Sequence, residues 1–301
     1  MKKFIAMLLA LVLCLSVLTA CGSKKDDTEA PAEDNKETAA AADDAQEDAD
    51  AADASDAEQP AEEGKTFTVG FDAEYPPYGY MDESGEYTGF DLELAQAVCD
   101  IYGWELVKQP INWDNKDADL NSETIDCIWN GFTMTGREDD YTWSEPYVDN
   151  SIVWIVKSDS GIETAEDLAG KNIVTQSGSS AYTALTNEED NDDNLALAAT
   201  FASLQAVPDY NTAFANLDSG LVDAIAVDIG VAKYQLDSRA DDSLKMLDAP
   251  LSTEQYAIGF KLGNTELRDQ VQDALNQLVD NGTFMELATK YELADMVCLG
   301  K

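Results

Sequence analysis

The hydrophobic pattern after residue 65 switches repeatedly between the two-residue period of a strand and the 3.6-residue period of a helix. Residues 66–71 alternate as a half-buried strand does, and residues 92–102 place apolar side chains at helical spacing after Asp91, a residue type that favours helix N-caps. The same reading predicts strands at 125–129, 151–156, 172–175 and 223–227, a single helical turn at 165–171, and helices at 179–185, 211–217, 230–236, 267–278 and 283–291. Strands separated by helices predict an α/β fold with largely parallel sheets.

Polar side chains follow several of these short apolar strands. Asp72, Thr133, Ser177 and Asp228 each come directly after one, or within a few residues of its end. In open α/β sheets, ligands bind beyond the carboxyl ends of the strands. We therefore expect these four segments to converge on one cleft.

Arg137 is the residue of greatest chemical interest in this group. It follows the hydroxyl-bearing turn of Thr133 and Thr135 in a chain where positive charge is scarce. A guanidinium presents a planar fork of donors that matches a carboxylate, so this segment could hold a small carboxylic acid. The alternative is a surface arginine that pairs with one of the three acids that follow it.

The first twenty residues are typical of a secretory signal peptide. They hold two lysines, an apolar run at 4–18 and small residues before Cys21. Residues 18–21 (LTAC) also resemble the lipobox of bacterial lipoproteins, in which the cysteine is lipidated and becomes the new N-terminus. The alternative is an ordinary cleaved signal with a chance cysteine.

Residues 22–65 should be a disordered linker. They contain no aromatic residue and alanine as the only aliphatic type, and they carry 16 acids against 4 bases. Such a segment buries too little apolar surface to offset its ordering entropy. We expect residues 21–65 to tether a folded body to the membrane through lipidated Cys21.

Composition excludes several classes of function. The formal net charge is −42, so phosphate backbones are repelled and nucleic acid is not expected as a partner. Histidine is absent, which excludes Ser-His-Asp and Cys-His catalysis and histidine-based metal sites. Cys99, Cys127 and Cys298 are isolated; the first two are expected to be buried, and the sequence leaves any disulfide pairing open.

The order of its motifs gives the chain a resemblance to a known family. The matching segments are 72–78 (DAEYPPY), 85–95, 125–128 (IDCI), 133–137 (TMTGR), 143–147 (WSEPY), 176–180 (QSGSS) and 281–283 (NGT). Over nearly all of residues 66–293 the chain resembles the extracytoplasmic solute-binding proteins of polar amino acid ABC importers. The resemblance implies a periplasmic-binding-protein-like α/β fold of two lobes, each a mostly parallel sheet flanked by helices, joined by two crossover strands. Lobe one would comprise 66–153 plus 255–301, and lobe two 154–254.

The resemblance also implies roles for individual residues. Arg137 would bind the ligand carboxylate, supported by Thr133 or Thr135, and Asp228 would accept the ammonium together with the carbonyl of Gly131. Ser180, at the start of a helix in lobe two, would add a hydroxyl and a backbone N–H to the same carboxylate. The remaining residues expected at the site are Ser179 beside it, Tyr75 and Trp113 as pocket walls, and Asp72. The family often has two residues between the last threonine and the arginine, whereas here only Gly136 intervenes, so which threonine supports Arg137 stays open.

Each role has a structural alternative. Asp228 could cap the helix that follows it, the serines could form a bare N-cap cluster, and Tyr75 and Trp113 could be core or rim aromatics. Asp72 and Glu74 could select a cationic side chain, although the matching positions occur in relatives with several ligands.

The resemblance implies a non-enzymatic function without a cofactor or metal. The protein would capture a polar amino acid outside the membrane, close two lobes around it and deliver it as a monomer to the transmembrane subunits of an ABC importer. Two alternatives remain, a dehydratase acting on a cyclic carboxylic acid and a sensory receptor that signals through a separate partner. The sequence does not identify the amino acid.

Overall fold

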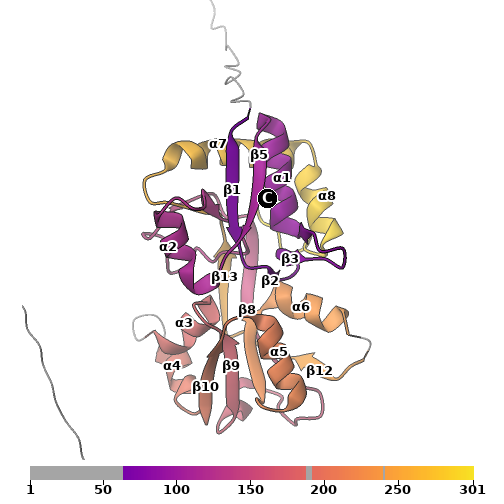
Figure 1. Ribbon diagram of the computed structural model, residues 1–301. Helices are drawn as coiled ribbons and strands as arrows, with labels where there is room; N and C mark the ends of the chain where they lie inside the picture. The colour runs from indigo at the N-terminus through magenta and orange to yellow at the C-terminus, as the bar shows by residue number, and fades with distance from the viewer. Residues whose placement is uncertain (1–63, 188–191, 240) are drawn as a thin grey trace, which may run out of the picture. The chain divides into compact units, whose positions relative to one another are not determined.

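The computed structural model describes residues 64–187, 192–239 and 241–301. The predicted signal peptide, Cys21 and all but the last two residues of the predicted linker lie outside these ranges. The described residues form two α/β lobes (Figure 1).

The first lobe is built on a five-stranded sheet with two parallel strands flanking its first strand. β1 (Thr66–Phe71) pairs in parallel with β5 and β6, and β14 is antiparallel to both of its neighbours, β6 and β7. In spatial order the strands are β5 (Glu105–Pro110), β1, β6 (Cys127–Ile128), β14 (Gly259–Phe260) and β7 (Thr142–Trp143). A small antiparallel sheet of β2 (Glu74–Tyr75), β3 (Gly79–Met81) and β4 (Tyr87–Thr88) follows β1.

The second lobe is built on a six-stranded mixed sheet. Its spatial order is β10 (Ser203–Val207), β9 (Asn172–Gln176), β11 (Ala224–Asp228), β8 (Val148–Lys157) and β12 (Leu244–Met246), and β13 (Ser252–Tyr256) also pairs with β8. β9, β10 and β11 are parallel, as expected for strands joined through helices, whereas β8 is antiparallel to all its neighbours. The prediction of parallel strands therefore holds for the helix-linked strands and not for the sheets as wholes.

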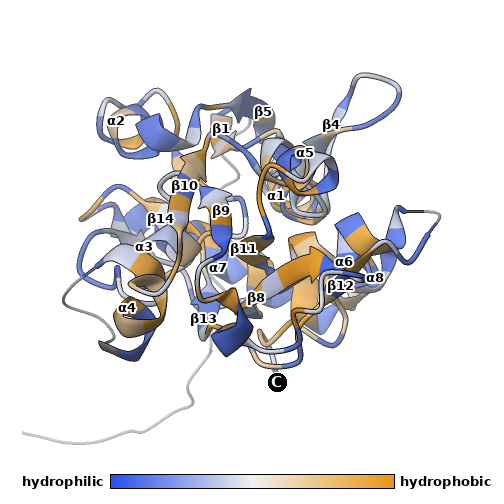
Figure 2. Cartoon of the chain, turned by 90° about the horizontal axis from the view of Figure 1, so that it is seen from below, coloured by the Kyte–Doolittle hydropathy of each residue, from blue (hydrophilic) through white to orange (hydrophobic). Residues whose placement is uncertain are grey.

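Helices cover both sheets. Around the first lie α1 (Phe90–Tyr102), α2 (Lys116–Asn121), α7 (Thr265–Asp280) and α8 (Thr283–Lys290); around the second lie α3 (Ser180–Thr186), α4 (Asp192–Ala198), α5 (Tyr210–Ser219) and α6 (Ile229–Asp237). Short 3-10 turns occupy Trp113–Asn115 and Ala165–Leu168. In Figure 2 strands such as β8 and β11 are largely hydrophobic while the helices carry both colours, because each helix turns only one face to a sheet.

Two long crossover strands connect the lobes. β8 and β13 run side by side and antiparallel, with Asn150 opposite Glu254 and Val148 opposite Tyr256 (Figure 1). The lobe boundaries expected from the sequence, after residues 153 and 254, fall inside these two strands. We propose that the pair is the hinge.

One local prediction is wrong. Asp91 does not cap α1, because the helix begins at Phe90 and Gly89 holds the N-cap position. The Asp91 carboxylate is fully buried and accepts hydrogen bonds from the Gly131 amide at 2.5 Å and the Tyr147 hydroxyl at 2.9 Å. It therefore fixes the turn after β6 from forty residues away.

The cysteine prediction is confirmed where burial is concerned. Cys99 and Cys127 are buried in the core of the first lobe, and Cys298 is partly buried. All three thiols are free.

Candidate functional site

A small cavity lies between the lobes, where strands from both sheets end. Its volume is about 20 Å³. It is lined by Tyr75, Trp113, Asn130, Gly131, Thr133, Arg137, Gln176, Ser179, Ser180 and Asp228. Eight of the ten residues expected at the site from the sequence are in this lining; the two outside it are Asp72 and Thr135.

Arg137 reaches the cavity from the loop after β6. Its Nη1 atom donates to the Thr133 carbonyl at 3.2 Å, and its guanidinium carbon lies 5.3 Å from the centre of the Phe132 ring. The Phe132 ring and the Thr133 carbonyl hold the guanidinium in place. They leave other N–H donors of the guanidinium without a hydrogen-bond acceptor among the described residues. Thr133, through its carbonyl, is thus the threonine that supports the arginine. Thr135 is exposed, and its hydroxyl instead accepts from the Gln255 amide at 3.1 Å.

Asp228 enters the cavity from the second lobe, at the end of β11. It occupies the N-cap position of α6, yet its carboxylate makes no capping hydrogen bond to that helix. The carboxylate accepts instead from Asn150 Nδ2 at 2.8 Å and from the Tyr256 hydroxyl, and the residue is 3 % exposed. Two donors from the hinge strands therefore orient this anion, which leaves the helix-cap alternative without support.

A buried acid that the sequence did not single out lies beside this pair. Glu254, on β13, accepts three hydrogen bonds at one oxygen, from Thr133 Oγ1 (2.7 Å), Asn150 Nδ2 (2.8 Å) and Ser180 Oγ (3.1 Å). Burial and then repulsion from Asp228 raise the pKa of Glu254 to about 7. Glu254 lies in a polar segment of the sequence, and nothing in that segment indicates a ligand site. Only the folded hinge brings the residue to the cavity.

The lobe-two serines sit where α3 begins. Ser179 is the N-cap and accepts from the Tyr182 amide at 3.1 Å, while its hydroxyl donates to the Gln176 carbonyl at 2.8 Å. The N-cap alternative is therefore correct for Ser179, which nevertheless lines the cavity. Ser180 differs, because its hydroxyl points to Glu254 of the hinge.

Aromatic residues form the walls of the cavity. The Tyr75 hydroxyl lies 3.1 Å from that of Tyr256, and the Trp113 ring meets the Phe132 ring edge to face at 5.5 Å. Gly131 has a φ of +55°, and a Cβ there would lie 2.9 Å from the Tyr256 ring and 3.0 Å from the Tyr75 ring. The floor of the cavity therefore requires glycine at this turn.

The two lobes touch each other around the cavity. Gln176 Nε2 from β9 donates to Asp72 Oδ2 at 2.6 Å, and Ser177 Oγ donates to Asp114 Oδ1 at 2.8 Å. Burial raises the pKa of Asp72. Typical ligand pockets have about 300 to 1,000 Å³, so a cavity of about 20 Å³ is too small to hold an amino acid.

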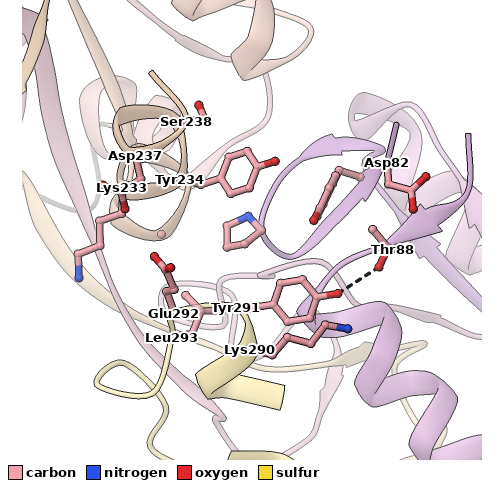
Figure 3. Close-up of a pocket in the computed structure, with 13 residues that line it drawn as sticks. Asp82, Thr88, Lys233, Tyr234, Asp237, Ser238, Lys290, Tyr291, Glu292 and Leu293 are labelled. Atoms are coloured by element: carbon pink, nitrogen blue, oxygen red, sulfur yellow. Dashed lines mark hydrogen bonds between the residues drawn. The ribbon is translucent and has the colours of Figure 1, made fainter. Parts of the chain in front are cut away.

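A larger cavity of about 540 Å³ lies elsewhere and contains none of the expected site residues (Figure 3). It is bounded by α6, the end of α8 and the small sheet; Tyr234 and Tyr291 face it, and Tyr80 is among its lining residues. Its lysine on α8, Lys290, is paired with Glu93. The larger cavity therefore differs in place and in lining from the cavity between the lobes.

Residues 64–187, 192–239 and 241–301 lack two features. No helix there is long and apolar enough to cross a membrane. The same ranges contain no group of three or more cysteine, aspartate or glutamate side chains that could hold a metal ion.

Two α/β lobes joined by paired crossover strands, with opposite charges from the two lobes in one cavity, define a hinged ligand-binding protein. Comparison with known proteins makes the class more specific. The model of the bacterial extracellular solute-binding proteins, family 3, matches residues 67–294, so the chain belongs to that family.

Individual relatives agree with this assignment. The chain is 30 % identical over 238 residues to the L-cystine-binding protein TcyJ of Escherichia coli K12, covering 78 % of this chain and 85 % of that protein. A substrate-binding protein of an ABC uptake transporter from Streptococcus pneumoniae, with bound histidine, is 33 % identical with a TM-score of 0.71, covering 75 % of this chain and 92 % of that one. The ancestral amino-acid-binding protein AncCDT-1, a precursor of cyclohexadienyl dehydratase, is 27 % identical with a TM-score of 0.67, covering 75 % and 95 %.

Proposed function

We propose that this protein captures a polar amino acid outside the membrane by closing its two lobes and delivers it to an ABC importer. The observation that carries the proposal is the placement of Arg137 and Asp228, from different lobes, in the lining of one cavity. An amino acid zwitterion carries a carboxylate and an ammonium a fixed distance apart. Arg137 would bind the carboxylate and Asp228 the ammonium.

Closure follows from the same arrangement. A ligand shifts a conformational equilibrium only by its difference in affinity between the two states. Because the two charges stand on different lobes, a zwitterion gains both ion pairs only when the cleft is shut. Ligand binding thus stabilises the closed form, which is the form that an importer distinguishes from the open one.

A thermal-shift screen of the purified protein against the common amino acids and cystine tests the function. A ligand at 100 times its Kd adds about 2.7 kcal/mol to the free energy of unfolding. For a body of this size that corresponds to a rise in Tm of roughly 5 to 10 °C. If no amino acid at millimolar concentration raises Tm, and titration calorimetry detects no binding, the proposal fails.

Membrane attachment is a separate part of the proposal. Cys21 would carry a lipid, and residues 22–65 would let the folded body move above the membrane as a monomer. Replacing Cys21 with alanine should move the protein from the membrane fraction to the medium or periplasm. Retention of that variant in washed membranes would contradict lipid anchoring.

A dehydratase is the second candidate, and one observation favours it. Glu254 is a buried carboxyl group with a pKa near 7 beside the cavity, which suits acid–base chemistry. Amino acid capture gives an ion-pair partner to both Arg137 and Asp228, whereas a cyclic carboxylic acid without an ammonium would give one only to Arg137. Chromatographic analysis of a cyclohexadienyl carboxylic acid incubated with the protein separates the two, since only an enzyme forms product.

A further inference from the structure

Glu254 lies at the centre of the hydrogen bonds that join the hinge to the ligand cavity. Its strand partner across the hinge is Asn150, whose side chain lies on the same face. The Asn150 amide donates both to Glu254 Oε1 and to Asp228 Oδ1, each at 2.8 Å. Two buried carboxylates are therefore joined through one amide group, with their bonded oxygens no more than about 5.6 Å apart, as two collinear 2.8 Å bonds allow.

The donors to Glu254 also determine what the cavity offers to a ligand. A hydroxyl has a single proton to donate and two lone pairs that accept. The hydroxyls of Thr133 and Ser180 both donate that proton to Glu254, although both residues also line the cavity. Toward the cavity these hydroxyls can therefore only accept hydrogen bonds. An ammonium supplies the matching donors, whereas a carboxylate does not.

The charged groups around Glu254 also favour an ammonium over a carboxylate. Asp228 from β11 faces it, the hydroxyls of Tyr78, Tyr210 and Tyr256 surround the pair, and Arg137 lines a neighbouring cavity of about 290 Å³ together with Glu254. No ion pair joins Glu254 or Asp228 to a lysine or arginine within the parts of the chain that the structure describes. In addition, the Asn150 Oδ1 atom is buried without a donor among these residues. The cluster thus has an excess of acceptors and negative charge.

We propose that Glu254 is a positioning residue that makes the site selective for a ligand with an ammonium group. It does so by holding the Thr133 and Ser180 hydroxyls as acceptors and by adding a second negative charge beside Asp228. The ligand carboxylate is left to Arg137 and to backbone N–H groups. This inference rests on the proposed function and assigns to the hinge strand a part in choosing the ligand.

The protonation of Glu254 is consistent with this role. With its pKa raised to about 7 by burial and by Asp228, the carboxyl group is ready to gain or lose a proton at neutral pH. An ammonium that binds beside Asp228 favours the ionised form. Glu254 also lines the neighbouring cavity of about 290 Å³.

The test compares amino acids with the 2-hydroxy acids that differ only at the ammonium. Titration calorimetry would measure L-cystine against 3,3′-dithiodilactate, L-arginine against argininate and L-histidine against imidazole-lactate. For the pair that binds, the measured quantity is the ratio of the two affinities. In Glu254→Gln the new amide can donate to one hydroxyl and turn its proton toward the cavity, so we expect the preference for the amino acid to fall at least tenfold. Glu254→Asp, which keeps the charge, should retain most of the preference.

Controls separate this role from a loss of structure. Glu266→Gln makes the same chemical change at an exposed position of α7 and should leave the ratio unchanged. Ser180→Ala removes one of the positioned acceptors and should lower the ratio in the same direction as Glu254→Gln, which gives a second test if that variant does not unfold cooperatively. An unchanged ratio in the folded Glu254→Gln protein, or in Ser180→Ala, overturns the inference while leaving amino acid capture intact. Absence of binding by any of the amino acids to the wild-type protein overturns both.

Discussion

Replacement of Arg137 with alanine is the most direct perturbation of the site. The guanidinium is the cation that lines the cavity, and it is half-buried on the Phe132 ring. Without it, a bound carboxylate would be enclosed between the lobes with no positive partner. We expect a large loss of ligand affinity and a small loss of stability.

The size of both effects can be worked from the geometry. Opposite charges 4 Å apart attract by about 4 kcal/mol at an effective dielectric constant of 20, and solvent near a half-buried group reduces this. Truncating one partner of a hydrogen-bonded charge pair costs about 2 to 5 kcal/mol, so we expect about 2 to 4 kcal/mol here. At 1.4 kcal/mol per tenfold, Kd should rise about 30-fold to several hundredfold. Folding loses only the hydrogen bond to the Thr133 carbonyl and the ring contact, together about 1 to 2 kcal/mol.

Titration calorimetry and urea unfolding of the same preparations would measure the two effects separately. Arg137→Lys is the matched variant, since it keeps the charge but not the planar fork, and it should recover only a minor part of the affinity. Arg268→Ala is the control, because that arginine pairs with Asp269 on the outer helix α7, away from the cavity. Unchanged affinity in Arg137→Ala would remove this residue from the site and with it the proposed carboxylate contact.

Three further perturbations follow from the same geometry. Asp228→Asn should weaken binding of the amino acid by about 2 to 5 kcal/mol in calorimetry, because the ammonium loses its anion, and unchanged affinity would refute that role. Gly131→Ala should destabilise the protein by about 1 to 3 kcal/mol in urea unfolding, because a Cβ at φ +55° meets the Tyr256 and Tyr75 rings; a neutral result would show that the turn relaxes. Burial raises the pKa of Asp91 from 3.8 to about 7, so the folded state binds more protons than the unfolded state between these values. Its contribution to stability is therefore fully present below about pH 4 and is lost as pH rises through 7, and Asp91→Asn should flatten the fall in unfolding free energy between about pH 4 and pH 7.

The sequence predicted the helix-linked part of the fold because that part is governed by local patterns. Periodicity located α1, α5, α6 and α7 to within a few residues of their observed ends. It missed the crossover strand β13 (Ser252–Tyr256), whose pattern is polar because one face turns to the cavity and not to a hydrophobic core. Resemblance to relatives, rather than periodicity, indicated that crossover strands exist.

For the site, the sequence predicted residues that follow strands and failed on residues whose roles depend on distant partners. Asp91 has the local context of a helix cap, but its carboxylate accepts a hydrogen bond from the amide of Gly131, forty residues away. Glu254 lies 121 residues from Thr133 and 74 from Ser180, so no spacing in the chain links them. From the resemblance, the Ser180 hydroxyl is expected to hold the ligand carboxylate and Thr133 or Thr135 to support Arg137, and neither expectation takes Glu254 into account. The Ser180 contact stays a prediction, and the orientation of the hydroxyl protons favours the ammonium instead.

The hinge and the ligand site form one hydrogen-bonded network in this protein. Asn150 on β8 and Tyr256 on β13 both donate to Asp228, and Glu254 on β13 accepts from Thr133 in the first lobe and Ser180 in the second. Each of these bonds joins a hinge strand to a group beside the ligand cavity. Opening the cleft must stretch at least some of them, since the first lobe carries Thr133 away from the second lobe with Ser180. On the proposed function, a ligand ammonium that binds beside Asp228 in the closed form adds its own hydrogen bonds to this network, which couples recognition to closure at the hinge.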